Sequence, residues 1–170
     1  MIPENRSATE RRWRAGDYSA IFLRLALGAS FLSAVADRFG LWGRPGEAHV
    51  GWGDFTHFTA YTARLTSILP TYLAPTLAWT ATILETILGL ALLLGIATRV
   101  AALLSGALLL LFAMAMTFAL GVKAPLDYSV FSASAGAFLL ASCERYRLSL
   151  DEMRRRDENK RYRCGLTCRW

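Results

Sequence analysis

Long apolar segments alternate with shorter polar stretches along the chain. Four segments are predominantly apolar, at 18–36, 76–97, 100–122 and 127–143. A helix needs roughly 17–25 such residues to cross a bilayer. The pattern therefore predicts an all-α integral membrane protein whose antiparallel transmembrane helices form a four-helix bundle. The fourth segment is short and rich in small residues, so a buried core helix is the alternative for it.

One long connection, the loop 37–75, is predicted to face outward. Its first part is punctuated by glycine and proline and has no regular period. In its second part Asp54 is a suitable N-cap, and apolar or small side chains then recur at helical spacing at Phe55, Phe58, Thr62, Leu65 and Leu69. This predicts an amphipathic helix over the mouth of the bundle or in the headgroup layer.

Composition supports a membrane protein. The chain is 54% hydrophobic and 19% charged, and its mean hydropathy is +0.32. Charges crowd into an N-terminal arm (1–17) and a basic tail (144–170), which flank the membrane domain 18–143. The positive-inside rule then places both termini in the cytoplasm. The net charge of +6 is explained by this topology and by anionic headgroups, and nucleic-acid binding is not predicted.

Short turns join the second segment to the third and the third to the fourth, which makes these helices antiparallel neighbours. The second turn reads "GVKAPLD". Its last residue, Asp127, is the expected N-cap of the fourth helix.

Two ionisable residues lie well inside the predicted spans, Arg24 and Glu85. Gly28 is one turn from Arg24, and Gly89 is one turn from Glu85, each on the same face as its charge. If these faces meet, Arg24 opposes Gly89 and Glu85 opposes Gly28. The remaining gap of about 9 Å is one that the two long side chains could close.

Three interpretations of Glu85 stay open. It forms a structural ion pair, or is protonated and bonded to Thr82, Thr86 or Ser30. Alternatively it lines a polar pocket for a proton, a quinone headgroup or another small ligand, since intramembrane charges often mark such sites. In the third case it faces a partner subunit.

Other polar residues offer weaker candidates. Asp37 and Arg38, at the outer end of the first segment, either cap it or rim a pocket. His49 and His57 with Asp54 supply too few ligands for a metal, so no metal site is predicted.

Cys164 and Cys168 lie four residues apart in the tail, which is not the C-x-x-C spacing of thiol redox proteins. A reducing cytoplasm also argues against a stable disulfide between them.

Several stretches together resemble the DoxX family. They are "LRLALGASFLSAVADRF", "AWTATILETILGLALLLGIATRVAALLSGALLL" and "KAPLDYSVFSASAGAFLLA". The resemblance implies a small four-helix inner-membrane protein, with Arg24 and Glu85 as a polar centre and Arg38 where relatives carry a basic residue. The naming member of that family is associated with a thiosulfate:quinone oxidoreductase.

The resemblance therefore implies a membrane subunit of a quinone-linked redox system, possessing no cofactor of its own and assembling with further protein subunits or as an oligomer. Quinone is the candidate ligand, and electrons would need a partner's cofactor. The alternatives are a non-catalytic scaffold or assembly factor, and a small transporter.

Overall fold

The computed structural model describes residues 15–143 and 146–152, and all regular elements among them are helical. Three helical segments are long and apolar enough to cross a membrane: α2 (Ala15–Arg38), Thr71–Leu94 and α5 (Thr98–Leu120). The second of these comprises the short 3-10 helix η1 (Thr71–Leu73) and α4 (Ala74–Leu94). The prediction of an all-helical membrane protein is confirmed. Residues 1–14, and the tail from 153 with Cys164 and Cys168, lie outside the described residues.

The fourth predicted span, 127–143, is shorter in the structure, where its helix α7 comprises only Val130–Ala141. A separate short helix, α6 (Lys123–Asp127), occupies the predicted turn, and Tyr128 and Ser129 separate it from α7. The 12 residues of α7 extend about 18 Å, less than the hydrocarbon core of about 30 Å. The four-span count is therefore not confirmed.

Asp127 does not cap the last helix. Its carboxylate instead forms an ion pair with Lys123, which lies one helical turn earlier. The residue before α7 is Ser129, in a left-handed conformation with φ of 54° and no capping side-chain bond. The expectation of an Asp127 cap was wrong because the helix breaks after this residue.

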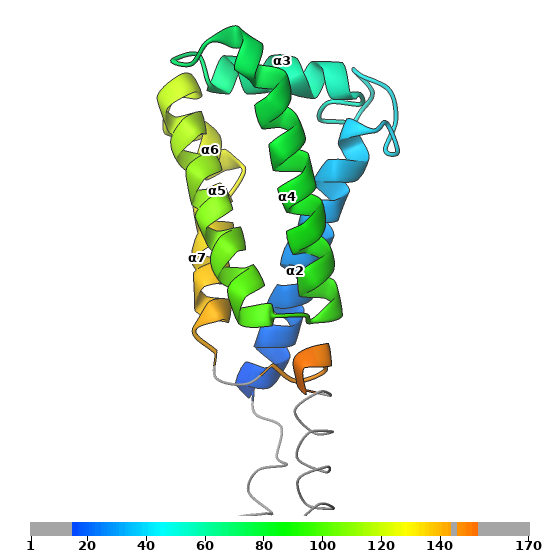
Figure 1. Cartoon of the computed structure of the whole chain (residues 1–170), viewed down its shortest axis with the longest axis vertical. Helices are drawn as coiled ribbons and strands as arrows, with labels where there is room; N and C mark the ends of the chain where they lie inside the picture. The colour runs from blue at the N-terminus through cyan, green and yellow to red at the C-terminus, as the bar shows by residue number, and fades with distance from the viewer. Residues whose placement is uncertain (1–14, 144–145, 153–170) are drawn as a thin grey trace, which may run out of the picture.

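The helices of the bundle are arranged as two pairs, α2 with α4 and α5 with α7 (Figure 1). Gly28 and Gly89 allow α2 and α4 to approach closely: a Cβ atom on Gly28 would lie 2.9 Å from the carbonyl oxygen of Gly89. Small residues are the usual means of close helix packing in lipid. This contact fixes the register of α2 against α4.

Small residues also bring α5 and α7 together. A Cβ atom on Gly106 would lie 2.8 Å from the ring of Phe138. The hydroxyl of Ser134 donates a 2.8 Å hydrogen bond to the Gly106 carbonyl oxygen. Ala102 and Ala137 are fully buried in this interface.

The predicted amphipathic helix is confirmed as α3 (Phe55–Leu65), which lies across one end of the bundle (Figure 1). Asp54 caps it, accepting a hydrogen bond from the backbone N–H of His57 at 2.7 Å. We call this end, with α3 and residues 39–54, the cap end. The opposite end, with the α4–α5 turn and residues 146–152, is the tail end.

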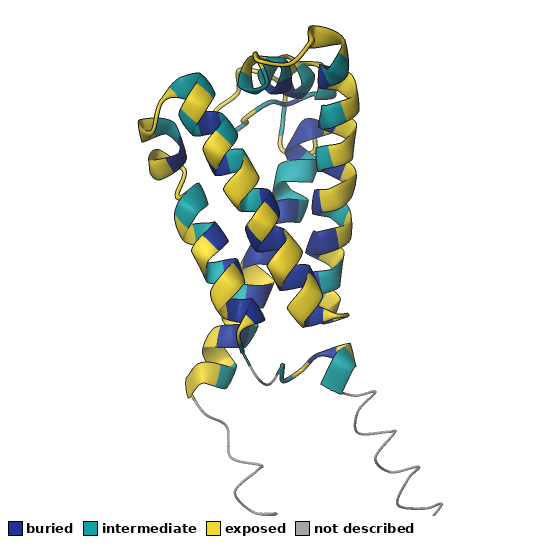
Figure 2. Ribbon diagram, turned by 60° about the vertical axis from the view of Figure 1, so that its left-hand side comes forward, coloured by how far each residue is buried: buried dark blue, intermediate teal, exposed yellow. Residues whose placement is uncertain are grey.

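The exterior of the long helices is largely apolar and exposed, while the buried positions face inward (Figure 2). Phe22 is 75% exposed, Leu111 65% and Phe118 74%. Apolar surface on this scale is unfavourable in water, and a lipid environment removes the penalty. Burial and hydropathy therefore agree on a membrane protein.

Candidate functional site

A buried ion pair lies between α2 and α4. The Nη2 atom of Arg38 donates to Oε2 of Glu85 at 2.6 Å, and Nη1 donates to the hydroxyl of Thr82 at 2.8 Å. Thr82 in turn donates to the carbonyl oxygen of Ala78. Both charged residues are only 2% exposed. Because a lone charge inside a membrane is unfavourable, each of these two charges stabilises the other.

Aromatic side chains from the cap cover the pair. The guanidinium of Arg38 lies 3.7 Å from the ring centroid of Phe58 in α3 and 5.5 Å from that of Trp52 in the preceding loop. The two rings contact each other edge to face. Cation–π attraction strengthens when water is excluded, so these rings both stabilise Arg38 and seal it from the cap end.

The neighbouring residue, Asp37, holds the loop in place. Its Oδ2 accepts hydrogen bonds from the backbone N–H groups of Gly51 at 3.1 Å and Trp52 at 2.8 Å. These bonds position Trp52 over Arg38. Asp37 thus holds the loop, and the adjacent Arg38 pairs with Glu85 inside the bundle.

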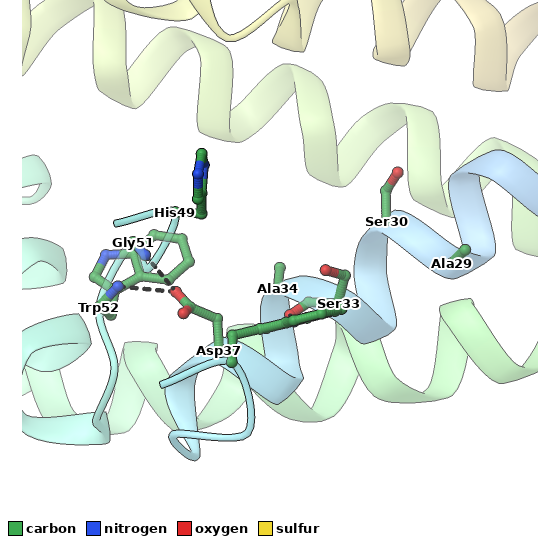
Figure 3. Close-up of a pocket in the computed structure, with 9 residues that line it drawn as sticks. Ala29, Ser30, Ser33, Ala34, Asp37, His49, Gly51 and Trp52 are labelled. Carbon is green, nitrogen blue, oxygen red and sulfur yellow. Dashed lines mark hydrogen bonds between the residues drawn. The ribbon is translucent and has the colours of Figure 1, made fainter. Parts of the chain in front are cut away.

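A pocket of about 650 Å³ lies beside α2, between that helix and the loop (Figure 3). The loop contributes Trp42, His49, Gly51 and Trp52, and α2 contributes Ala29, Ser30, Ser33, Ala34 and Asp37. Asp37 therefore does rim a pocket, which was one of the two roles expected for it. Trp52 is shared, since it lines this pocket and also contacts Arg38.

Arg24 does not pair with Glu85, contrary to the sequence prediction. Its Nη2 donates to the carbonyl oxygen of Leu148 at 2.7 Å, at the tail end. The register explains the difference: Gly28 faces Gly89 rather than Glu85, which displaces Arg24 by a further turn. The structure thus separates Arg24 from Glu85 and brings Arg38 to it instead.

The tail end has polar contacts of its own. Asp151 accepts hydrogen bonds from the backbone N–H groups of Ala97 and Thr98, both at 2.9 Å, and so caps α5 from a distant part of the chain. Arg147 forms a 3.2 Å ion pair with Asp17 at the start of α2. These contacts hold residues 146–152 against the bundle.

The histidines do not form a metal centre with other described residues, among which no group of three potential ligands lies together. The ring Nδ1 of His57 lies 2.9 Å from Asp54 at the start of α3. The backbone N–H of His57, followed by its side chain, lowers the pKa of Asp54 below its ordinary value. The interaction of Asp54 with His57 therefore stabilises the N-terminal end of α3.

Sequence reasoning missed the aromatic cover and the pocket-lining serine Ser33. The available signal was the position of Arg38 at the end of an apolar helix, followed by a glycine-rich loop that returns two aromatic residues, Trp52 and Phe58. A basic residue so placed either extends to the headgroups or folds inward under a cover. The sequence alone does not distinguish these arrangements.

Comparison with known protein families identifies a match. A family model described as methylamine utilisation protein MauE matches residues 16–127. No curated protein and no solved structure matches the chain. The expected membership of the DoxX family is therefore wrong. That resemblance depended on apolar runs of low chemical specificity, and the thiosulfate:quinone analogy loses its basis with it.

Proposed function

The chain belongs to the methylamine utilisation protein MauE family, and from this premise we propose that it is a membrane accessory protein of a methylamine utilisation system. The family description supports the assignment to methylamine utilisation. The apolar exterior and the three helices of membrane-spanning length support the location.

We assign the chain a scaffold role within that system. The observation that carries this role is the closed Arg38–Glu85 pair: each side chain is 3% exposed and their contact is 2.6 Å. This buried ion pair joins the end of α2 to the middle of α4 and holds the aromatic side chains that cover it. Such a contact fixes the positions of the two helices and the loop, and it leaves no opening for a substrate at the two charges.

We place the cap end on the outer side of the inner membrane and both termini in the cytoplasm. The distribution of basic residues supports this orientation, since Arg99 and Arg147 lie at the tail end and the sequence that follows Arg147 is rich in basic residues. The cap would then present α3 and residues 39–54 to other proteins of the same system.

Growth of a strain that carries this gene tests the role. Deletion should abolish growth on methylamine as nitrogen source and leave growth on ammonium unchanged, and the wild-type gene should restore it. Normal growth of the deletion strain on methylamine would overturn the assignment to this process.

The scaffold role is tested separately by the double variant Arg38→Met/Glu85→Leu. Apolar residues of similar volume often replace a buried ion pair without loss of stability. We expect this variant to fold and to restore growth, whereas the Glu85→Leu single variant, which leaves Arg38 unpaired, should accumulate poorly. A folded double variant that fails to restore growth would show that the charges themselves are needed.

A quinone-linked role is the competing proposal. The observation that favours it is the sharing of Trp52 between the pocket and the ion pair, which places a bound ligand one side chain away from Arg38. Organic extraction of the purified protein, followed by mass spectrometry, tests it. Stoichiometric quinone would support this role, and its absence from protein purified in mild detergent would remove it.

A further inference from the structure

Residues 146–152, which we call the strap, turn polar side chains toward the bundle and leucines away from it. Ser149 is 1% exposed, and Asp151 binds backbone N–H groups at the start of α5. By contrast, Leu148 is 69% exposed and Leu150 41%. A surface that faces water has the opposite arrangement, with apolar side chains preferentially inside. Polar groups turned inward beneath an apolar exterior are typical of a surface that contacts lipid.

The fold holds the strap in this orientation. Arg24 donates from Nη2 to the carbonyl oxygen of Leu148 at 2.7 Å. The backbone of Leu148 is left-handed, with φ of 53°, a conformation that persists in a non-glycine residue only where its surroundings impose it. A Cβ atom on Gly95 would lie 2.6 Å from Cβ of Ser149, so the strap packs directly on the α4–α5 turn. The outward direction of Leu148 is therefore fixed by contacts on both sides of it.

The strap lies where the apolar exterior of the bundle ends (Figure 1). On α5 the exposed apolar side chains extend from Val100 to Phe118, which is about 27 Å along the helix. This length is close to the hydrocarbon thickness of a bilayer, about 30 Å. Thr98, two residues before Val100, binds Asp151 of the strap. The strap is thereby placed at the boundary between acyl chains and headgroups.

Size, continuity and charge favour lipid over a protein as the partner of this surface. Two leucines offer little area, whereas a stable protein interface buries about 1,200–2,000 Å². The exposed side chains of Tyr18 and Phe22 continue the apolar surface along α2, and the ion pair of Asp17 with Arg147 joins the start of that helix to the strap. Arg99, exposed near the start of α5, adds a positive charge that suits anionic headgroups.

We propose that the strap is an interfacial anchor, with Leu148 and Leu150 inserted among the lipids of the leaflet at the tail end. Removal of apolar surface from water favours this insertion. Asp151 caps α5, and the carbonyl oxygen of Leu148 holds Arg24 of α2. Insertion of the two leucines therefore ties the tail ends of α2 and α5 to the bilayer surface. The anchor is independent of the scaffold role.

The depth of single spin labels tests the anchor. The full chain, with its three cysteines replaced by serine, carries one nitroxide through Leu148→Cys or Leu150→Cys. It is placed in nanodiscs of phosphatidylethanolamine and phosphatidylglycerol. Oxygen concentrates in hydrocarbon and a nickel chelate stays in water, so the ratio of their collision rates with the label reports depth. Leu111→Cys, at an exposed position of α5, is the lipid-facing reference.

We expect both strap labels to collide more often with oxygen than with nickel, as the Leu111 label does. Preferential collision with nickel at both positions would place the strap in water and overturn the anchor. Low collision rates with both reagents would show that protein covers the leucines, a second copy of the chain included, and would overturn it equally. A label that displaces the strap accelerates hydrogen exchange at the start of α5, and the other label then decides.

A second measurement needs no label. Serine at both positions, Leu148→Ser/Leu150→Ser, removes contact with lipid while leaving the inward polar contacts in place. Exchange of the amides of 146–152 in nanodiscs, corrected for intrinsic rates, should become faster by about tenfold or more. The matched control is Leu104→Ser/Leu111→Ser, at exposed positions of α5, which should leave strap exchange unchanged. Equal strap exchange in wild type and the strap variant would overturn the anchor whatever the labels show.

Discussion

Arg38 and Glu85 are 47 residues apart in sequence, and their side chains meet at 2.6 Å inside the bundle. Arg38 is the last residue of α2, whereas Glu85 lies near the middle of α4. The guanidinium therefore folds back along the helices instead of extending toward the headgroups. The aromatic residues above it, Trp52 and Phe58, replace water as its surroundings on that side.

The first prediction concerns the stability contributed by this pair. Glu85→Leu leaves Arg38 buried and uncompensated, so it should lower the free energy of unfolding by about 3–5 kcal/mol. Adding Arg38→Met should recover most of that loss, because no buried charge then remains. Chemical unfolding in detergent, monitored by circular dichroism, measures both. Equal losses in the single and double variants would contradict mutual compensation.

The second prediction concerns the contact between α2 and α4. A Cβ atom on Gly28 would lie 2.8 Å from Cγ of Leu93 and 2.9 Å from a backbone oxygen. Gly28→Val should therefore push the helices apart and lower the unfolding free energy by about 1–3 kcal/mol. Gly16→Ala is the control, because no atom lies within 4 Å of the Cβ it adds. A Gly28→Val protein as stable as wild type would show that this close approach is not required.

Hydropathy was sufficient to predict the long helices, because a bilayer imposes both length and apolar composition. Local side-chain chemistry was sufficient for α3 and its Asp54 cap. Each of these features depends on residues close in sequence.

The partner of Glu85 was not predictable in this way. It depends on the register between two helices, and one turn of displacement at Gly28 and Gly89 is enough to separate Arg24 from Glu85. It also depends on a loop whose conformation is fixed by Asp37, a contact between distant residues. The break between α6 and α7 was missed because Tyr128 and Ser129 carry no glycine or proline signal.

The third prediction concerns the tail end. Asp151 caps α5 through the N–H groups of Ala97 and Thr98 and accepts the Thr98 hydroxyl at 3.1 Å. Asp151→Ala should lower stability by about 1–2 kcal/mol, as the loss of a helix cap does, and should release residues 146–152 from the bundle. Hydrogen exchange at the start of α5 measures this. Ser142→Ala, at an exposed position, is the control, and unchanged exchange in the Asp151 variant would contradict the cap.

The fourth prediction concerns pH at the cap end. The backbone and side chain of His57 lower the pKa of Asp54 from its ordinary 3.8. A carboxyl group whose pKa is lower in the folded state stabilises that state above its unfolded pKa, and the contribution disappears as the pH falls through the folded value. Helix α3 should therefore fray at its first turn below about pH 4.

Amide hydrogen exchange of residues 55–58, corrected for the intrinsic pH dependence, should show this loss of protection in the wild type. Asp54→Asn keeps a capping oxygen that does not titrate, so its protection should be independent of pH over the same range. Equal pH dependence in the two proteins would show that another group controls the start of α3.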